Sequence, residues 1–373
     1  MFEETKPSTQ TIMGEKPLVY PPVVLAHIVD DLRDYFAPKI KGKDSVELHY
    51  SAQLNGHPHI GTLTSLATAF TVGEYIQKRF EKEAVLKFEA LDNAPIGKFR
   101  FDDREYCRMH AHHLVDGVPL SKIYMDSFSK VMNYFSIRTG VKFETETYGV
   151  FQKNPFVRSK LLEIIERESE FIPFIAPSEG KLRIRFPCGS CNVMEKTSKD
   201  SKILDNSNPR DLLYQSNCSE HGDFQVRISE NNDALIDFNT SLRNVIKEAK
   251  FIEDSKKSNT MNLMVDGGDW TGMAFQVMQS LGLMGYSISD LPLRIFSPII
   301  EDWSGAKFSK SIYVKEGTYK HIPEEFLNYT KFKETFGDKG LDIILKESRS
   351  WVEEPKKLFR NYSTDYLRKV FNI

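Results

Sequence analysis

The sequence has 373 residues, of which 50 are lysine or arginine and 52 are aspartate or glutamate. This length is enough for two or three domains with a large core, and the balanced charge excludes a strongly basic protein that binds nucleic acid through its overall field. No apolar run approaches the roughly 18 residues of a membrane span, and the N-terminal residues do not have the pattern of a signal peptide. We therefore expect a cytoplasmic protein without a membrane partner.

Residues 1–45 are expected to form an N-terminal arm followed by a helix, because apolar side chains recur at helical spacing between residues 23 and 40. A strand is predicted at residues 46–50 and a long helix at residues 63–80, where Leu63, Leu66, Ala67 and Phe70 share one face. The turn between this strand and this helix is the first candidate site.

The turn at residues 51–62 reads Ser-Ala-Gln-Leu-Asn-Gly-His-Pro-His-Ile-Gly-Thr. Gly56 and Gly61 allow a ligand to approach the backbone, and the free N–H groups at the start of a helix favour an anion such as phosphate. His57 and His59 add two hydrogen-bond donors. The alternative interpretation is that both histidines only pack against neighbours or cap the helix.

A buried parallel strand is predicted at residues 84–91, followed directly by Asp92 and Asn93. Polar residues at the carboxyl end of a parallel strand face the crevice in which open α/β sheets bind ligands. Asp92 and Asn93 are therefore candidate pocket residues, although they could also only cap the turn before Pro95.

Three histidines, His110, His112 and His113, lie within four residues of one another. No carboxylate follows or precedes these histidines at the sequence spacing of a metal ligand, and only Cys107 offers a thiol nearby. The pattern favours a solvent-exposed helical face over a metal site. Further along, a strand is predicted at residues 141–145 and a charged helix at residues 155–171.

The cysteines at positions 188, 191 and 218, with the histidine at position 221, form a C-x2-C pair and a C-x2-H pair separated by 26 residues. Both spacings are typical of zinc knuckles, and four protein ligands complete a tetrahedron. A closed site cannot activate water, so this pattern predicts a structural zinc ribbon and excludes zinc hydrolase chemistry. The alternative is a set of unconnected thiols in an ordinary loop.

After the ribbon, residues 234–239 lead into a helix, and a strand is predicted at residues 261–266. That strand is followed by Gly267, Gly268 and Asp269, where a carboxylate could accept hydrogen bonds from ribose hydroxyls; a plain turn is the alternative. A third strand, at residues 293–300, leads to the sequence Lys307-Phe308-Ser309-Lys310-Ser311, whose two lysines could neutralise charge on a triphosphate.

In combination, these elements resemble the catalytic core of class I aminoacyl-tRNA synthetases. Residues 59–62 match the family's H-I-G-H element in three of four positions, and residues 307–311 match its K-M-S-K-S element in four of five. Residues 267–269 fit its G-x-D turn. Within this class, the stretch from 46 to 314 is most similar to class I lysyl-tRNA synthetases, which implies ATP, Mg²⁺ and structural Zn²⁺ as cofactors, an amino acid as substrate and a tRNA acceptor end as partner.

The resemblance implies roles for individual residues, each in ATP-dependent formation of an aminoacyl-adenylate. The residues expected to act in catalysis are His59, Thr62, Lys307 and Lys310. Those expected to bind the nucleotide are Gln53, Gly56, His57, Gly61, Gly267, Asp269, Ser309 and Ser311. Those expected to bind the amino acid are Asp92, Asn93 and Asp237, and the metal ligands are Cys188, Cys191, Cys218 and His221.

Two departures from the family bear on substrate and partner. The acidic cluster that would suit a lysine ammonium is reduced here to Asp92-Asn93-Ala94-Pro95, so lysine is a provisional substrate. About 60 residues follow the lysine-rich motif, too few for the family's helical anticodon-binding region. Residues 356–369 are basic with interleaved aromatics and could contact RNA or form a terminal amphipathic helix that docks on the core.

The sequence thus predicts a Rossmann-like parallel α/β sheet with helices on both faces, a zinc-ribbon insertion and a small C-terminal helical region. The expected boundaries are 1–45 (arm and helix), 46–175 and 234–315 (the two halves of the nucleotide-binding domain), 176–233 (ribbon) and 316–373 (helical region). A free-standing amino-acid activator with a non-tRNA acceptor, a catalytically silent nucleotide- or tRNA-binding paralogue and a simple nucleotidyltransferase are the competing functions. The oligomeric state is not predicted.

Overall fold

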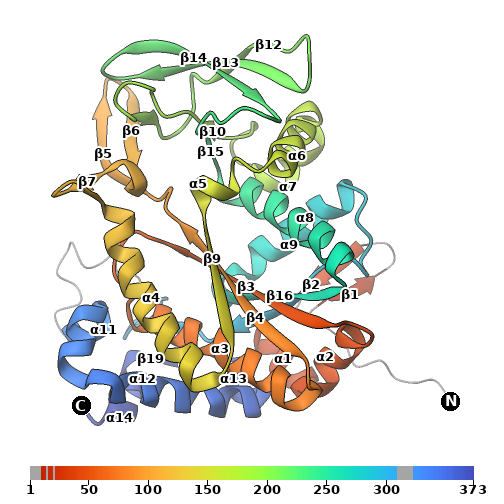
Figure 1. Ribbon diagram of the computed structural model, residues 1–373, viewed down its shortest axis with the longest axis vertical. Helices are drawn as coiled ribbons and strands as arrows, with labels where there is room; N and C mark the ends of the chain where they lie inside the picture. Colours follow the sequence, from red (N-terminus) through yellow and green to blue (C-terminus); the bar gives the residue numbers. More distant parts are fainter. Residues whose placement is uncertain (1–9, 14–15, 20–21, 309–321) are drawn as a thin grey trace.

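The centre of the molecule is a five-stranded parallel sheet with the strand order β17-β16-β3-β4-β9 (Figure 1). The computed structural model describes residues 10–13, 16–19, 22–308 and 322–373, with side chains from Leu25 onward. The strands are β3 (Ser45–Gln53), β4 (Glu83–Leu91), β9 (Lys142–Thr147), β16 (Thr260–Gly267) and β17 (Leu293–Ser297). The earliest of the five is central, so the order reverses between β3 and β16, as in a Rossmann fold.

Helices cover both faces of this sheet and form two apolar cores. One core contains α2 (Leu32–Ile40), α3 (Ile60–Phe80), α4 (Leu120–Thr139) and α12 (Tyr329–Glu353). The other contains α6 (Pro155–Glu166), α7 (Glu168–Ile175), α8 (Thr240–Ser258) and α9 (Thr271–Leu283). The predicted fold class, a Rossmann-like parallel sheet between two layers of helices, is therefore confirmed.

The sequence explains these elements directly. The first six residues of β16 are all buried, the continuous pattern of a strand covered on both faces. Helix α8 begins at the cap residue Asn239, whose side chain accepts a hydrogen bond from the N–H of Leu242, and ends at Asn259 in a left-handed conformation. The strand predicted at residues 293–300 stops at Ser297, because Pro298 has no N–H with which to continue the ladder.

The single helix predicted at residues 23–40 is in fact two helices, α1 (Pro22–Ile28) and α2. Asp31 separates them: its backbone is extended, and its side chain accepts a hydrogen bond from the N–H of Arg33 at 2.8 Å. Asp31 therefore caps a new helix within a stretch whose apolar spacing suggested one continuous helix. Before α1, β1 (Gln10–Met13) and β2 (Lys16–Val19) form an antiparallel pair.

The cysteine-containing region lies beyond the carboxyl end of the sheet, at the top of Figure 1. It consists of two three-stranded antiparallel sheets and one short pair. The strands are β5 (Pro95–Phe101), β6 (Arg104–Met109), β11 (Met194–Glu195), β12 (Lys202–Asp205), β13 (Asp211–Cys218), β14 (Gly222–Ser229), β10 (Ile184–Arg185) and β15 (Asp237–Phe238). Residues 95–109, expected in the first half of the nucleotide-binding domain, thus pair with the segment that carries the first two cysteines.

The histidine cluster is not the exposed helical face that the sequence suggests. His110 and His112 lie in a short 3-10 helix, η1 (His110–His112), where His110 is only 4% exposed. Burial lowers the pKa of His110 to about 4, so its ring is neutral at physiological pH. This prediction was wrong because the segment packs between the hairpin β7 (Leu114–Val115) and β8 (Val118–Pro119) and helix α4.

The C-terminal region is helical, as predicted, and packs on the sheet domain. It comprises α11 (Glu324–Leu327), α12, α13 (Pro355–Leu358), β19 (Tyr362–Ser363) and α14 (Thr364–Phe371). Leu358, Leu367 and Phe371 are buried in the same core as α3. Strand β19 pairs in parallel with β18 (Ile300–Glu301), which places this region beside the chain that leads to Lys307. The docking interpretation of residues 356–369 thus agrees with the packing.

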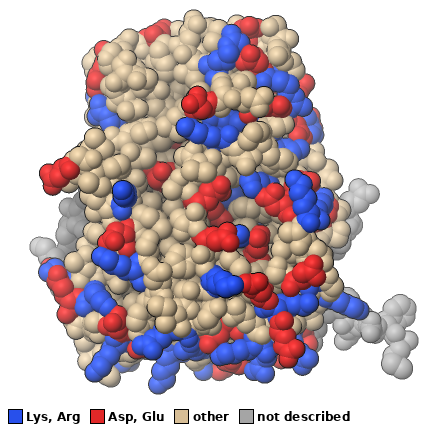
Figure 2. All heavy atoms as spheres, viewed as in Figure 1, with Lys and Arg blue, Asp and Glu red and all other residues tan. Residues whose placement is uncertain are grey.

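Basic and acidic side chains are interspersed over the face shown in Figure 2. This distribution matches the near-neutral net charge of the sequence. Within the part of the chain that the structure describes, no helix combines the length and apolar character that crossing a membrane requires.

Candidate active site

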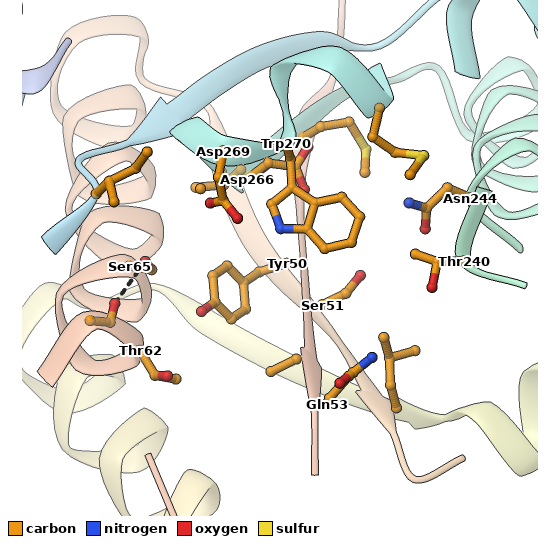
Figure 3. Close-up of a pocket in the computed structure, with 18 of the residues that line it drawn as sticks. Tyr50, Ser51, Gln53, Thr62, Ser65, Thr240, Asn244, Asp266, Asp269 and Trp270 are labelled. Atoms are coloured by element: carbon orange, nitrogen blue, oxygen red, sulfur yellow. Dashed lines mark hydrogen bonds between the residues drawn. The ribbon is translucent and has the colours of Figure 1, made fainter. Parts of the chain in front are cut away.

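A cavity of about 280 Å³ opens at the carboxyl ends of β3 and β16, where the strand order reverses. This is the position at which open α/β sheets bind ligands. Side chains from five elements meet there (Figure 3): Tyr50, Ser51 and Gln53 from β3, Thr62 and Ser65 from α3, Thr240 and Asn244 from α8, Asp266 from the end of β16, and Asp269 and Trp270 from the η2 turn (Gly268–Trp270).

The glycine-histidine turn forms one wall of the cavity and leads into α3. His59 is the N-cap of this helix, and its Nδ1 accepts a hydrogen bond from the N–H of Gly61 at 3.1 Å. In the neutral ring this bond leaves the proton on Nε2, which makes that nitrogen a hydrogen-bond donor. A Cβ atom at position 61 would lie 3.0 Å from His59 Cε1, so glycine permits this tight cap. His59 therefore caps the helix and also lines the cavity.

The other residues predicted in this turn also line the cavity, namely Gln53, Gly56, His57, Gly61 and Thr62. Helix α4 contacts the ring of His57 at two residues. The Nδ1 of His57 lies 2.7 Å from the Oγ of Ser127, and the ring packs edge-on against Tyr124 with ring centroids 5.1 Å apart. At the start of α3 the backbone N–H groups have no carbonyl partner within the helix, and the N–H of Gly61 donates to His59. The turn therefore presents histidine donors and a helix N-terminus to one cavity.

The Gly-Gly-Asp turn lies on the opposite wall, after β16. Gly267 and Asp269 line the cavity, and the Asp269 carboxylate forms an ion pair with Lys307 at 2.5 Å. A Cβ atom at position 267 would lie 2.6 Å from Asp269 Oδ1, a distance that real Cβ contacts do not reach. Glycine at this position therefore sets where the carboxylate can sit.

The lysine-rich motif reaches the same place from β18. Phe308 is 1% exposed and packs edge-on against His59 with ring centroids 5.5 Å apart. Its N–H donates to the carbonyl of Ile300 at 2.8 Å. Three turns that lie between residues 59 and 308 of the chain are thus joined by two contacts, His59 with Phe308 and Asp269 with Lys307. Ser309, Lys310 and Ser311 lie outside the described residues.

The residues expected to bind the amino acid lie together but do not line this cavity. Asn93 donates to a carboxylate oxygen of Asp237 at 2.6 Å, and the other oxygen of Asp237 is ion-paired with Arg185. Asp92 accepts a hydrogen bond from the N–H of Gly149 at 3.3 Å, and burial raises its pKa. These contacts join the first half of the sheet domain to β10 and β15.

Several polar or charged residues of α8 line the cavity, although none of them was predicted to act there. Thr240, Arg243, Asn244, Lys247 and Glu248 do so, and Arg243 and Lys247 are almost fully buried. Their spacing of three and four residues places them on one helical face, beside the apolar Leu242, Val245, Ile246 and Ala249. A polar stripe of this kind within a buried helix is the signal from which the sequence could have identified them.

Lys247 belongs to a buried network beneath the cavity. Its ammonium donates to Ser51 Oγ and lies 3.2 Å from the carboxylate of Glu89, which Ser51 also contacts. His49 lies between Glu89, at 3.3 Å, and the side-chain oxygen of Asn262, at 3.0 Å. Burial alone would raise the pKa of Glu89, but attraction to Lys247 and the contact with His49 hold it below its usual range. Glu89 is therefore an anion already matched by a cation.

A second buried network joins β16, β17 and α8. Arg294 is ion-paired with Glu248 at 2.5 Å and with Asp266 at 3.3 Å, and its backbone carbonyl accepts from the Tyr35 hydroxyl at 2.6 Å. Burial raises the pKa of Asp266 to about 6 despite the attraction of Arg294. Asp266 is thus a carboxylate of the cavity whose pKa lies close to neutral pH.

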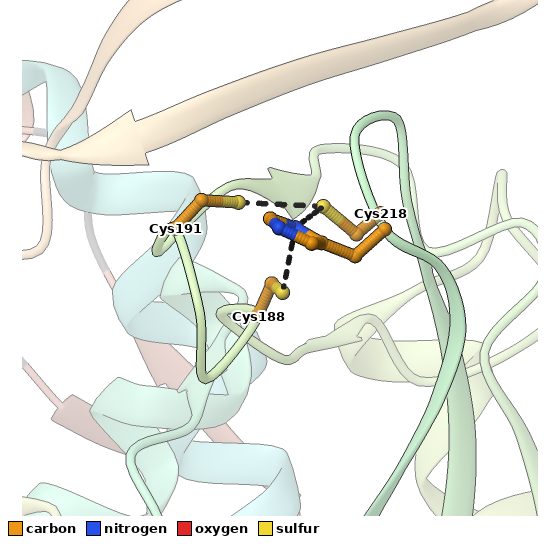
Figure 4. Close-up of side chains that lie close together, drawn as sticks. Cys188, Cys191 and Cys218 are labelled. Atoms are coloured by element: carbon orange, nitrogen blue, oxygen red, sulfur yellow. Dashed lines mark hydrogen bonds between the residues drawn. The ribbon is translucent and has the colours of Figure 1, made fainter.

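The cysteine pairs converge as the spacing predicts (Figure 4). The ligand atoms of Cys188, Cys191, Cys218 and His221 all lie within 4.8 Å of one another. Three thiols and one imidazole nitrogen are a donor set that suits a four-coordinate structural zinc site. Burial alone would raise the pKa of Cys188, but backbone N–H groups of Ser190 and Cys191 lower it to about 7, which favours the thiolate that a metal needs.

Comparisons with known proteins give only distant matches. No protein-family model matches the sequence, and no curated protein matches it. Among solved structures, a glutamate tRNA ligase from Elizabethkingia meningosepticum in complex with its amino acid matches with 12% identity and a TM-score of 0.37, over 87% of this chain and 68% of that chain.

Two further solved structures match at a similar level. A glutamate-tRNA synthetase from Elizabethkingia anophelis has 14% identity and a TM-score of 0.32, over 86% of this chain and 68% of that chain. A proposed arginyl-tRNA synthetase from Campylobacter jejuni has 9% identity and a TM-score of 0.34, over 87% of this chain and 68% of that chain. Because these scores are low, they carry no conclusion about the function of this chain.

Proposed function

We propose that this chain activates an amino acid with ATP, forming an aminoacyl-adenylate and pyrophosphate, and transfers the aminoacyl group to the 3′ end of a tRNA. The observation that carries the proposal is the meeting of three turns in one cavity at the switch point of a Rossmann sheet. His59 contacts Phe308 and Asp269 contacts Lys307, so the three elements that resemble class I synthetase motifs form one site.

The nucleotide would occupy the part of the cavity between α3 and the η2 turn. The N–H groups at the start of α3, with Nε2 of His59 and the side chain of His57, would bind phosphate oxygens. Asp269 would accept hydrogen bonds from the ribose hydroxyls. Lys307, held beside the cavity by Asp269, is placed to exchange that carboxylate for phosphate. Lys310, Ser309 and Ser311 are assigned to the phosphates from the sequence alone.

In the reaction, the amino-acid carboxylate attacks the α-phosphate in line with the leaving pyrophosphate. The residues of the cavity contribute positioning and stabilise the charge that builds up on the phosphates, and none of them forms a covalent intermediate. Mg²⁺ bound with the nucleotide would neutralise part of the phosphate charge. Asp266 and Asp269 are oxygen donors of the type it prefers.

The cluster of three cysteines and one histidine would hold a structural Zn²⁺ ion. The metal would tie the knuckle of Cys188 and Cys191 to the turn between β13 and β14, since Cys218 ends β13 and His221 precedes β14. All four ligands come from the protein, so the ion would stabilise the fold without binding substrate.

Amino-acid-dependent exchange of labelled pyrophosphate into ATP tests the proposed reaction. We expect exchange with the wild-type chain, and its loss in His59→Ala, Lys307→Ala and Lys310→Ala. Lys142→Ala, which removes an exposed lysine of β9 paired with Glu83, serves as the control and should retain the wild-type rate. ATP binding without exchange, for every amino acid, would refute the enzyme and favour a silent nucleotide-binding protein.

Addition of tRNA to the same assay identifies the acceptor. We expect the chain to recognise the acceptor end of the tRNA, so transfer to tRNA should tolerate changes in the anticodon. Adenylate formation without tRNA charging would favour the free-standing activator. The sequence resemblance implies lysine as the substrate, so lysine belongs in the amino-acid panel.

A further inference from the structure

The α8 side of the cavity is the part that the proposed nucleotide leaves open. Thr62 and Asp269 lie toward α3 and the η2 turn, whereas Thr240 and Asn244 lie on the far side of the Trp270 ring in Figure 3. His59 caps α3, and Lys307 is paired with Asp269. An amino acid that attacks the α-phosphate must occupy this second part. Its side chain would therefore meet the polar residues of α8.

Each carboxylate that lines the cavity in the described chain already has a basic partner. Glu248 and Asp266 are paired with Arg294, and Asp269 is paired with Lys307. Glu89, which lies beneath the cavity, is matched by Lys247. A substrate ammonium would have to displace one of these internal cations, and breaking a buried ion pair is costly.

Arg243 is in the opposite situation. Its side chain is 3% exposed and lines the cavity, and its Nε has no hydrogen-bond partner. Its one hydrogen bond to a side chain goes to Thr240 Oγ1 at 3.4 Å, and its guanidinium lies over the ring of Tyr148 at 5.7 Å. No carboxylate among the described residues forms an ion pair with it, because the nearby Asp237 is occupied by Arg185 and Asn93.

A buried guanidinium whose Nε has no hydrogen-bond partner, at a substrate cavity, is an incomplete ion pair. Guanidinium groups bind carboxylates through two parallel hydrogen bonds, and such a pair is strong when water is excluded. Thr240 and Asn244, on the same face of α8, offer further neutral polar groups. The cavity thus offers a cation to an anionic side chain and offers a cationic side chain only carboxylates that are already paired.

We propose that the amino acid activated here carries a carboxylate in its side chain, and that Arg243 is the residue that selects it. This inference rests on the proposed function and narrows it, since the resemblance implied lysine instead. Lys247 acts as the internal partner that keeps Glu89 from attracting a cationic substrate.

The first experiment measures pyrophosphate exchange with glutamate, aspartate, glutamine, asparagine, leucine, lysine and arginine. We expect the two acidic amino acids to give the highest kcat/KM. In Arg243→Gln this value should fall for the acidic amino acids by at least about tenfold relative to their amides, while the Kd for ATP stays unchanged. Arg227→Gln, in which an exposed arginine of β14 is replaced, is the matched control.

The outcomes separate this inference from the proposed function. Exchange supported by lysine rather than by an acidic amino acid overturns the inference alone. An equal loss for all amino acids in Arg243→Gln also overturns it, because Arg243 would then bind a group that all of them share, such as the α-carboxylate. Exchange with no amino acid, despite ATP binding, overturns the proposed function and the inference with it.

A second pair of variants tests the role of Lys247. Lys247→Met leaves Glu89 without its cation and is expected to raise the ratio of lysine to glutamate exchange by about tenfold or more. Lys247→Met combined with Glu89→Gln removes both charges and should abolish that gain. A ratio unchanged in the single variant, with ATP binding intact, contradicts the assignment of Lys247.

Discussion

The position of the Asp269 carboxylate depends on the absence of a side chain at residue 267. Gly267 has φ −70° and ψ 149°, values that alanine adopts readily, so the backbone itself does not require glycine. The requirement comes from contact, because a Cβ atom at position 267 would lie 2.6 Å from Asp269 Oδ1. In Gly267→Ala the carboxylate must therefore move.

We expect Gly267→Ala to weaken ATP binding by about tenfold, or about 1.4 kcal/mol, while thermal stability changes little. Isothermal titration calorimetry with ATP and a thermal unfolding scan measure the two effects. Gly272→Ala is the matched control, because a Cβ atom there has no other atom within 4 Å. Unchanged ATP affinity in Gly267→Ala would show that Asp269 does not bind the ribose.

Asp266 links the cavity to the pH dependence of stability. Burial raises the pKa of this carboxyl to about 6, above the ordinary value of 3.8. Between these two values the folded chain keeps a proton that the unfolded chain has lost, so the free energy of unfolding falls as the pH rises through this range. The contribution is at most about 3 kcal/mol, from about 1.4 kcal/mol per pKa unit.

Asp266→Asn removes this titration, so the variant should gain stability relative to wild type as the pH rises from about 4 to about 7. Urea unfolding of both proteins at several pH values in this window gives the difference directly. Parallel curves for the two proteins would mean that Asp266 titrates at its ordinary pKa in the folded state.

At the scale of single residues, the motifs could be located in the sequence because each motif is local. His59, Gly61 and Asp269 stand next to turns that the strand and helix patterns already mark. Arg294 and Glu89 could not be predicted in the same way, because their partners lie 46 and 158 residues away along the chain. Only the fold brings these charges together.

At the scale of elements, helix α8 shows how a periodic pattern can be interpreted incompletely. Leu242, Val245 and Ile246 indicate a helix with an apolar face, and this helix is present. The same turns place Arg243 and Lys247 on a neighbouring face that the fold also buries, against the cavity. Charged residues are usually exposed to solvent, so a hydrophobic pattern in the sequence does not indicate which of them are buried at a site.

The zinc knuckles are an element whose contribution can be isolated. We expect about one zinc ion per chain in the purified protein, lost in Cys191→Ser because three ligands bind zinc much more weakly than four. Elemental analysis after exhaustive dialysis gives the stoichiometry, and the thermal midpoint should fall together with the metal.

Cys107→Ser is the control for this prediction. Cys107 is a buried free cysteine of β6 that does not belong to the cluster, and burial raises its pKa to about 11, which makes it a poor thiolate ligand. Its replacement should leave the zinc content unchanged. Zinc near zero in the wild-type chain would favour the interpretation of unconnected thiols.

At the scale of the whole molecule, the order of strands and helices could be predicted because alternation of strands with helices leaves few topologies open. The pairing of more distant strands with the ribbon could not be predicted in this way. Hairpin β5–β6 precedes the cysteines by about 80 residues, yet β6 pairs with β11 through Cys107 and Met194. A contact of this length leaves no periodic signal in the sequence.

The C-terminal region provides the remaining long-range contact of the site. The N–H of Tyr362 donates to the carbonyl of Ile299 at 3.0 Å, and Asn361 Nδ2 donates to the Glu301 carboxylate at 2.5 Å. These bonds hold β18, whose next residues lead to Lys307 and Phe308. Strand β19 and the residue before it therefore support, from outside the sheet, the chain that leads to the proposed nucleotide site.

Deletion of residues 362–373 should therefore lower pyrophosphate exchange by about tenfold or more and reduce the thermal midpoint, because it removes β19 and the buried side chains of Leu367 and Phe371. Deletion of the exposed residues 372–373 alone is the matched control and should change neither. If the longer deletion lowers only the thermal midpoint, and exchange below that temperature proceeds at the wild-type rate, then β18 holds the lysine-rich motif without help from the C-terminal region.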